Sequence, residues 1–196
     1  MAAYLSSLPR TVVTGFVLAV IVYLVLANGM IGSGFLPYFF RWLHIICGVM
    51  WIGLLWYFNF VQVPSMAQIP AEQKPAVTKV IAPRALFWFR WGAMATLITG
   101  LLLAASMDNF ALVYLREALS LGEAQRAIGI GIWLAFIMWF NVWFIIWPNQ
   151  KKVLGITPVD ADATAKAAKW AGAASRINTL LSITMLLGMA GGSHFG

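Results

Sequence analysis

Residues 41–64 read RWLHIICGVMWIGLLWYFNFVQVP, and this stretch decides the fold. The run is apolar and long enough, at about 1.5 Å per helical residue, to cross the roughly 30 Å hydrocarbon core of a bilayer. It contains His44, one of only 2 histidines in the chain, together with Cys47 and Asn59. Polar side chains in such a segment need a partner or a cavity. The sequence therefore predicts a membrane-spanning helix that carries candidate chemistry.

The whole chain has the composition of an integral membrane protein. Of its 196 residues, 62% are hydrophobic and 10% are charged, whereas soluble domains carry about 25% charged residues. The mean hydropathy is +0.85. The net charge of +7 would suggest nucleic acid in a soluble protein, but here the cations lie between apolar runs, where they set orientation and meet anionic lipid. The single cysteine excludes an intrachain disulfide.

Five apolar runs predict an all-α bundle of five transmembrane helices within a single integral membrane domain, residues 1–196. We expect the spans at about 11–27, 36–63, 85–106, 127–147 and 174–190. Pro64 and Pro148 should end the second and fourth spans, because proline disrupts a helix interior. Before the last span, Thr157-Pro158 predicts an N-cap followed by proline at the first helical position. The helix that starts there should lie on the membrane surface or run straight into the fifth span.

An internal repeat supports these boundaries. Residues 51–59 read WIGLLWYFN, and residues 133–141 read WLAFIMWFN. Each stretch is followed by a proline, a basic loop and a helix that opens with an arginine, Arg90 or Arg176. The second and third spans therefore form one predicted hairpin, and the fourth and fifth spans form its parallel repeat.

Lysine and arginine gather on one side of the predicted topology. That side carries Arg10, Lys74, Lys79, Arg84, Arg90, Lys151, Lys152, Lys166, Lys169 and Arg176. The other side carries Arg41, Arg116 and Arg126. Since basic loops stay in the cytoplasm, we expect a multi-pass membrane protein with its N-terminus in the cytoplasm and its C-terminus outside.

The two histidines are the candidate metal ligands. The topology places His44 and His194 on the same side of the membrane, where two imidazoles from separate helices can hold the iron of a non-covalent b-type haem. Gly48 lies one turn after His44 and would let a flat macrocycle approach the helix. The alternatives are a hydrogen-bonded His44 with no metal, or copper held by His44, Cys47 and Met50, which are soft ligands on adjacent turns.

Two asparagines and two arginines form a second candidate polar site. Asn59 and Asn141 stand about a turn and a half from the inner boundary, and Arg90 and Arg176 stand at the matching depth on the returning helices. An Asn–Arg hydrogen bond inside each hairpin would satisfy both groups. The alternative is a site for a lipid headgroup, a quinone or an anionic substrate. The spans contain no Asp or Glu, which argues against a proton pump or an ion-coupled transporter.

Three stretches resemble a known family. Residues 41–64, with the motif W-L-H-x-x-x-G-x-x-W-I-G, are joined by RWGAMATLITGLLL at 90–103 and FNVWFIIWPNQKKVLG at 140–155. Together they resemble the membrane domain of bacterial membrane-bound urate hydroxylase over residues 35–155, and more loosely in the last span. A fainter likeness is to small haem-binding membrane proteins that act as protoporphyrinogen oxidases, which place a histidine early in a helix rich in Trp and Gly.

The resemblance implies an oxidoreductase or electron-transfer subunit that passes electrons to a cytochrome c or a partner subunit. Full-length family members join this membrane region to a C-terminal cytochrome c domain, but this sequence contains no C-x-x-C-H motif for covalent haem. Two other readings stay open. One is a non-catalytic accessory subunit of a larger respiratory or photosynthetic complex, and the other is an autonomous urate-oxidising enzyme. The sequence leaves the catalytic residues unknown.

Overall fold

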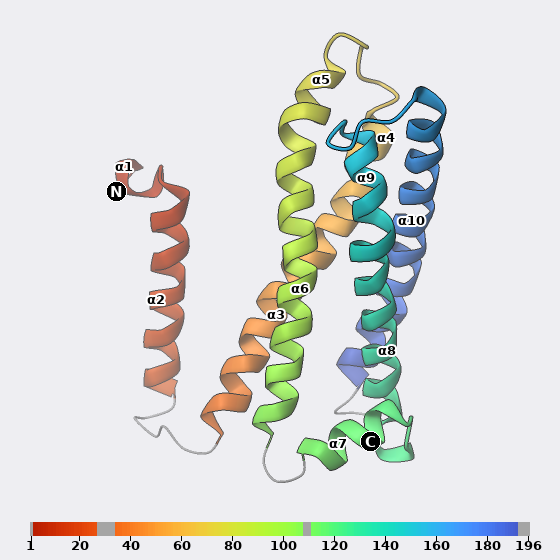
Figure 1. Cartoon of the computed structure of the whole chain (residues 1–196). Coiled ribbons are helices and arrows are strands. Elements are labelled where there is room, and N and C mark those ends of the chain that lie inside the picture. Colours follow the sequence, from red (N-terminus) through yellow and green to blue (C-terminus); the bar gives the residue numbers. More distant parts are fainter. Residues whose placement is uncertain (1, 27–33, 108–110, 192–196) are drawn as a thin grey trace. The chain divides into compact units, whose positions relative to one another are not determined.

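The computed structural model describes residues 2–26, 34–107 and 111–191, with the side chains of 2, 3, 111 and 112 left aside (Figure 1). The regular elements among these residues are all helices, with no strand. The described part contains 5 helices long and apolar enough to cross a membrane, which confirms the all-α membrane fold. The chain divides into two compact units, Met1–Leu36 and Pro37–Gly196.

The first unit consists mainly of one membrane helix. A short helix α1 (Ala2–Leu5) precedes α2 (Leu8–Leu26), and the two are joined by a hydrogen bond of 2.8 Å between Tyr4 Oη and Thr14 Oγ1. None of the residues of α2 is buried. A helix that is apolar on all sides has the character of a membrane span. It begins earlier than predicted, because Pro9 is compatible with a first helical turn.

Four long helices form the second unit. Each runs without a break through one or more of the elements given next, and we call it a rod. In chain order its elements are α3 (Phe35–Trp56, whose first two residues belong to the first unit), η1 (Tyr57–Gln62), α4 (Val63–Ser65), α5 (Lys74–Ala76), η2 (Val77–Ile81), α6 (Ala82–Ser106), α7 (Ala111–Leu119), η3 (Glu123–Gln125), α8 (Arg126–Phe140), η4 (Asn141–Ile146), α9 (Trp147–Val153) and α10 (Ala161–Gly191). Figure 1 shows α4, α5 and α9 toward one end of this unit and α7 at the other.

Pro148 does not end the fourth span, which corrects the prediction there, whereas the second span does end close to Pro64. The second span continues to Ser65 and the fourth to Val153. In both rods, and again at Pro83, the proline is the second residue after a π-helical segment: η1, η4 and η2. A proline lacks the N–H group and its ring clashes with the carbonyl four residues earlier. The wider π turn moves that carbonyl aside, so the helix passes through the proline without ending.

The start of the last helix also differs from the prediction. Asp160, and not Thr157, caps α10, because its Oδ1 atom accepts a hydrogen bond of 2.7 Å from the backbone N–H of Ala163. Gly155, with φ of 72°, ends α9 and directs the chain into the turn that precedes this cap. Pro158 therefore lies in the connection, and α10 runs without interruption for 31 residues into the fifth span.

The core of the second unit lies where its four rods meet. Trp51 and Leu55 of α3 are almost fully buried, as is Met138 of α8, at 1%, 0% and 0% exposed. Close approach of α8 and α10 depends on glycine: a Cβ atom at Gly188 would stand 2.8 Å from the backbone nitrogen of Gly131. Without a hydrophobic drive between helices in lipid, such small-residue contacts are the main source of helix association.

Candidate functional site

His44 lies at the interface between α3 and α6. Its Nδ1 atom stands 2.9 Å from the carbonyl oxygen of Thr96 and 3.3 Å from Oγ1 of Thr99. A carbonyl oxygen can only accept, so Nδ1 must carry the hydrogen and donate it. In the neutral ring this leaves Nε2 with an unshared electron pair. No described residue donates a hydrogen bond to Nε2 of His44.

Gly100 allows the imidazole ring to lie against α6. A Cβ atom built at Gly100 would stand 3.0 Å from Cε1 and 3.2 Å from Nδ1 of His44. The hydroxyl of Thr99 is itself fixed, since it donates 2.7 Å to the carbonyl oxygen of Ala95. The sequence reasoning missed Thr96, Thr99 and Gly100. The available signal was the run TLITG at 96–100, which combines two hydroxyls and a glycine at the depth of His44 on the neighbouring span.

The predicted role of Gly48 is compatible with its surroundings. It lies one turn after His44 on α3, and no described atom comes within 4 Å of the position that its Cβ would take. Open space therefore flanks the helix there. His194, the second predicted ligand, lies outside the described residues, and its proximity to His44 stays a prediction.

Only two of the three predicted copper ligands, His44 and Cys47, lie close to the same neighbour. The Cys47 side chain also lies next to the Thr99 side chain, so Cys47 and His44 share one neighbour. Met50 instead packs near Gly92, about two turns away along α6: its Cγ atom would lie 3.4 Å from a Cβ at that glycine. Over the described residues, no group of three or more His, Cys, Asp and Glu side chains is close enough to hold a metal ion.

The asparagines bond to α10, which corrects the expected Asn–Arg pairs. The amide nitrogen of Asn59 donates 2.8 Å to Oγ of Ser175. The amide nitrogen of Asn141 donates a hydrogen bond of 2.8 Å to Oδ1 of Asn178. The amide nitrogen of Asn178 in turn donates a hydrogen bond of 2.9 Å to the carbonyl oxygen of Met138. The expected pairing failed because depth in the membrane does not fix direction around the helix axis. Ser175 and Asn178 lie on the faces of α10 that the amides meet.

The two arginines have different surroundings. The guanidinium carbon of Arg90 lies 3.7 Å from the ring centre of Trp147 and 5.6 Å from that of Phe87. This cation–π contact places positive charge on the electron-rich face of an indole. Arg176 is exposed on α10. The structure thus does not bring the four predicted polar residues together, and α10 is the shared partner of the two asparagines.

A further indole is tied to the same helix. Nε1 of Trp56 donates 3.0 Å to Oγ of Ser182, and that hydroxyl donates 2.7 Å to the carbonyl oxygen of Thr179. With the bond between Asn59 and Ser175, this bond joins α3 and η1 to α10 at two levels. Hydrogen bonds between membrane helices contribute roughly 0.6 kcal/mol each. The polar contacts of the second unit therefore hold the rods in register and do not involve Nε2 of His44.

Comparison with known proteins gives no relative: no protein-family model, no curated protein and no solved structure matches this chain. What the site can do must therefore be argued from its own residues.

Proposed function

We propose that the chain is a membrane-embedded electron-transfer or oxidoreductase subunit that binds a b-type haem through His44. The observation that supports this most directly is the hydrogen bond from Nδ1 to the carbonyl oxygen of Thr96. Metal-binding histidines commonly donate their other N–H to such a carbonyl, which fixes the ring and keeps the ligand nitrogen unprotonated. When bound, a haem supplies a one-electron redox centre.

The neighbours of His44 suit this role. Thr96 and Thr99 hold Nδ1 from α6, and Gly100 gives the ring a flat surface to rest on. Gly48 leaves open space one turn along the same helix, where a planar group could approach the backbone. These residues orient the imidazole and keep its second nitrogen available for the metal.

His194 is the proposed second axial ligand. The proposal rests on the predicted topology, which puts the end of the fifth span on the side of the membrane where His44 lies. If His194 does not reach the metal, a residue of a partner subunit would take that position. The absorption spectrum distinguishes a six-coordinate from a five-coordinate haem, so His194→Ala gives a direct test of this part.

The proposed environment is the bacterial inner membrane, with the N-terminus in the cytoplasm. The distribution of lysine and arginine supports it, because ten of them lie on one predicted side and three on the other. In this orientation the end of the second unit that carries α7 faces outward. The proposed electron acceptor is an external cytochrome c or a partner subunit. The sequence likeness to the urate hydroxylase membrane domain makes urate the first substrate to assay.

The decisive experiment is the absorption spectrum of the purified chain. We expect a Soret band that is lost in His44→Ala and weakened in Gly48→Leu, which fills the open space while keeping the imidazole. Gly53→Leu is the matched control, because Gly53 also faces open space on α3 but lies away from His44. A colourless wild-type protein, prepared with haem supplied during expression, would reject the proposal.

A colourless protein would favour the alternative, a non-catalytic accessory subunit of a larger respiratory or photosynthetic complex. The observation in favour of that reading is the exposed aromatic surface of the second unit, where Trp88, Phe144 and Trp170 are 57%, 58% and 59% exposed. Such side chains can meet either lipid or another protein. Retention of the chain in a large complex, without bound cofactor, would support it.

A further inference from the structure

A groove separate from the His44 site runs along the surface between η1 and the η2–α6 rod. Its volume is about 350 Å³, and it is shallow and widely open to the surroundings. Leu54 and Tyr57 line it from one wall, and Val80, Ile81, Arg84 and Trp88 line it from the other. This volume is within the range of about 300–1,000 Å³ that is typical of small-molecule sites.

The walls of this groove are mostly apolar, with one fixed positive charge. Val80, Ile81 and Trp88 are about half exposed, at 55%, 46% and 57%. The polar groups are the guanidinium of Arg84 and the hydroxyl of Tyr57. In the described part of the chain Arg84 has no carboxylate within ion-pair distance. An occupant must therefore offer an anionic group at one point and an apolar body elsewhere.

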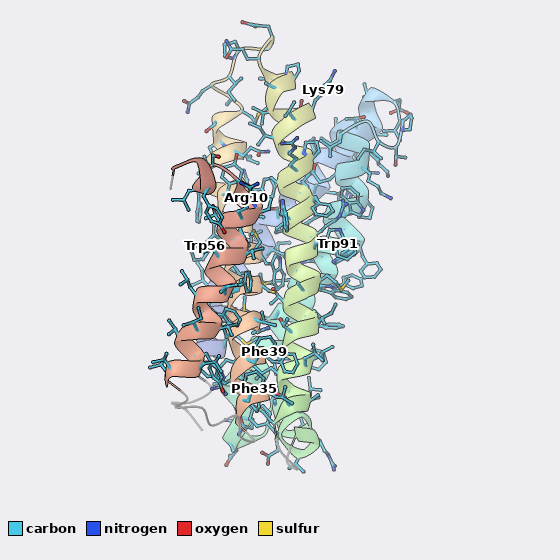
Figure 2. All side chains as sticks on the ribbon, turned by 90° about the vertical axis from the view of Figure 1, so that its left-hand side faces the viewer. Arg10, Phe35, Phe39, Trp56, Lys79 and Trp91 are labelled. Atoms are coloured by element: carbon cyan, nitrogen blue, oxygen red, sulfur yellow. The ribbon has the colours of Figure 1, made fainter. Side chains whose placement is uncertain are left out.

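The order of these groups along the rod matches that of a phospholipid. Figure 2 shows Lys79 toward one end of the η2–α6 rod and Trp91 nearer its middle. Arg84 lies between them in sequence, and Trp88 is one turn, about 5.4 Å, further from the charged end than Arg84. Cation, indole and aliphatic wall thus follow one another as headgroup, interface and acyl chain do in a bilayer.

We infer that this groove binds one anionic phospholipid, with its phosphate on Arg84 and an acyl chain along Leu54 and Trp88. Arginine is suited to this contact because its planar fork can hold two phosphate oxygens at once. Lys79, one turn earlier on the rod, adds attraction for a net negative headgroup. A small water-soluble anion would leave the apolar walls unused, and a neutral quinone would leave Arg84 without a counter-charge.

Native mass spectrometry of the purified full chain tests this inference. The probes are phosphatidylglycerol and phosphatidylcholine with identical acyl chains. We expect one phosphatidylglycerol to be retained in preference to phosphatidylcholine. Arg84→Gln should weaken its binding about five-fold, the ratio that corresponds to ~1 kcal/mol for one cation near an anionic surface. Ala85→Phe, which fills the groove from α6, should lower binding of both lipids.

The control is Lys152→Gln, a cation of α9 that does not line the groove. It should leave phosphatidylglycerol binding unchanged. Equal retention of the two lipids, an equal effect of Arg84→Gln and Lys152→Gln, or full binding by Ala85→Phe would each overturn the inference. The readout is bound lipid mass and does not depend on haem, so its failure leaves the proposed function of His44 untouched.

Discussion

Substitution of Gly100 by alanine tests the His44 site without removing a polar group. The added Cβ would stand 3.0 Å from Cε1 of His44, whereas ordinary contacts begin at 3.4 Å, so the ring must withdraw by about 0.4 Å. Such a shift would stretch the 2.9 Å bond between Nδ1 and the carbonyl oxygen of Thr96 to about 3.3 Å. That is beyond the roughly 2.7–3.2 Å range of N–H···O hydrogen bonds.

Two free energies of opposite sign decide the effect on stability. Alanine in a helix interior is favoured over glycine by ~1 kcal/mol. Loss of the Nδ1 hydrogen bond costs ~1 kcal/mol, and more if the donor stays buried without a partner. We therefore expect Gly100→Ala to change the free energy of unfolding by less than about 1 kcal/mol. The control Gly53→Ala, where nothing lies within 4 Å of the new Cβ, should stabilise the protein by roughly 0.5–1 kcal/mol.

The assay is thermal or denaturant unfolding of both variants in the same detergent, followed by the Soret absorbance of each. Disturbing the group that orients a metal ligand typically weakens the metal site about 10–100-fold. Gly100→Ala should therefore lose haem at concentrations where Gly53→Ala retains it. Equal stabilisation of the two variants would refute the close contact of Gly100 with the ring. Unchanged haem retention in Gly100→Ala, with a change in stability of the expected small size, would refute the role of that contact in the site.

Three more predictions concern the rest of the second unit. Asn178→Ala removes the acceptor of the Asn141 amide and the donor to the Met138 carbonyl, so it should lower the free energy of unfolding by roughly 1–3 kcal/mol; a double-mutant cycle with Asn141→Ala should show coupling between the two. Gly188→Ala places a Cβ 2.7 Å from the carbonyl oxygen of Ala127 and 2.8 Å from the nitrogen of Gly131, and the forced separation of α8 and α10 should cost roughly 1–3 kcal/mol, measured by the same unfolding assay. Burial raises the pKa of the Tyr114 phenol, in part offset by the charge of Arg41. Because the folded protein then holds this proton more tightly than the unfolded chain does, the associated stability is complete below about pH 10 and is lost as the pH rises through the folded-state pKa. Tyr114→Phe should flatten that alkaline loss, and the phenolate absorbance of the folded protein should show one tyrosine fewer with a raised pKa.

The fold was largely predictable because length and hydropathy decide it. Each span is a long apolar run, and this signal does not depend on how the helices pack against one another. The ends were less predictable. A proline usually stops a helix, and the second span does end near Pro64, but the π turn of η4 lets the fourth span continue past Pro148 to Val153. A π turn depends on which carbonyl must move, and hydropathy carries no information about that.

The site was predictable only in part. His44 and Gly48 stand out in a single sequence, since a histidine in an apolar helix needs a partner. Its partners do not stand out, because Thr96 and Gly100 become its neighbours only through the antiparallel register of α3 against α6. The same limit explains Asn59 and Arg90. Equal depth predicted their contact. The two side chains point in different directions around their helices, so Asn59 bonds to Ser175 and Arg90 lies over Trp147.

The repeat in the sequence shows why the second hairpin has no copy of the His44 site. With Trp51 aligned to Trp133, His44 corresponds to Arg126, and with Arg90 aligned to Arg176, Gly100 corresponds to Leu186. The second hairpin thus has neither the imidazole nor the glycine against which it would lie. Its α10 instead bonds to the asparagines of both hairpins. One hairpin therefore carries the proposed ligand site while the other provides polar partners for both asparagines, and more than one bound haem per chain would contradict this division.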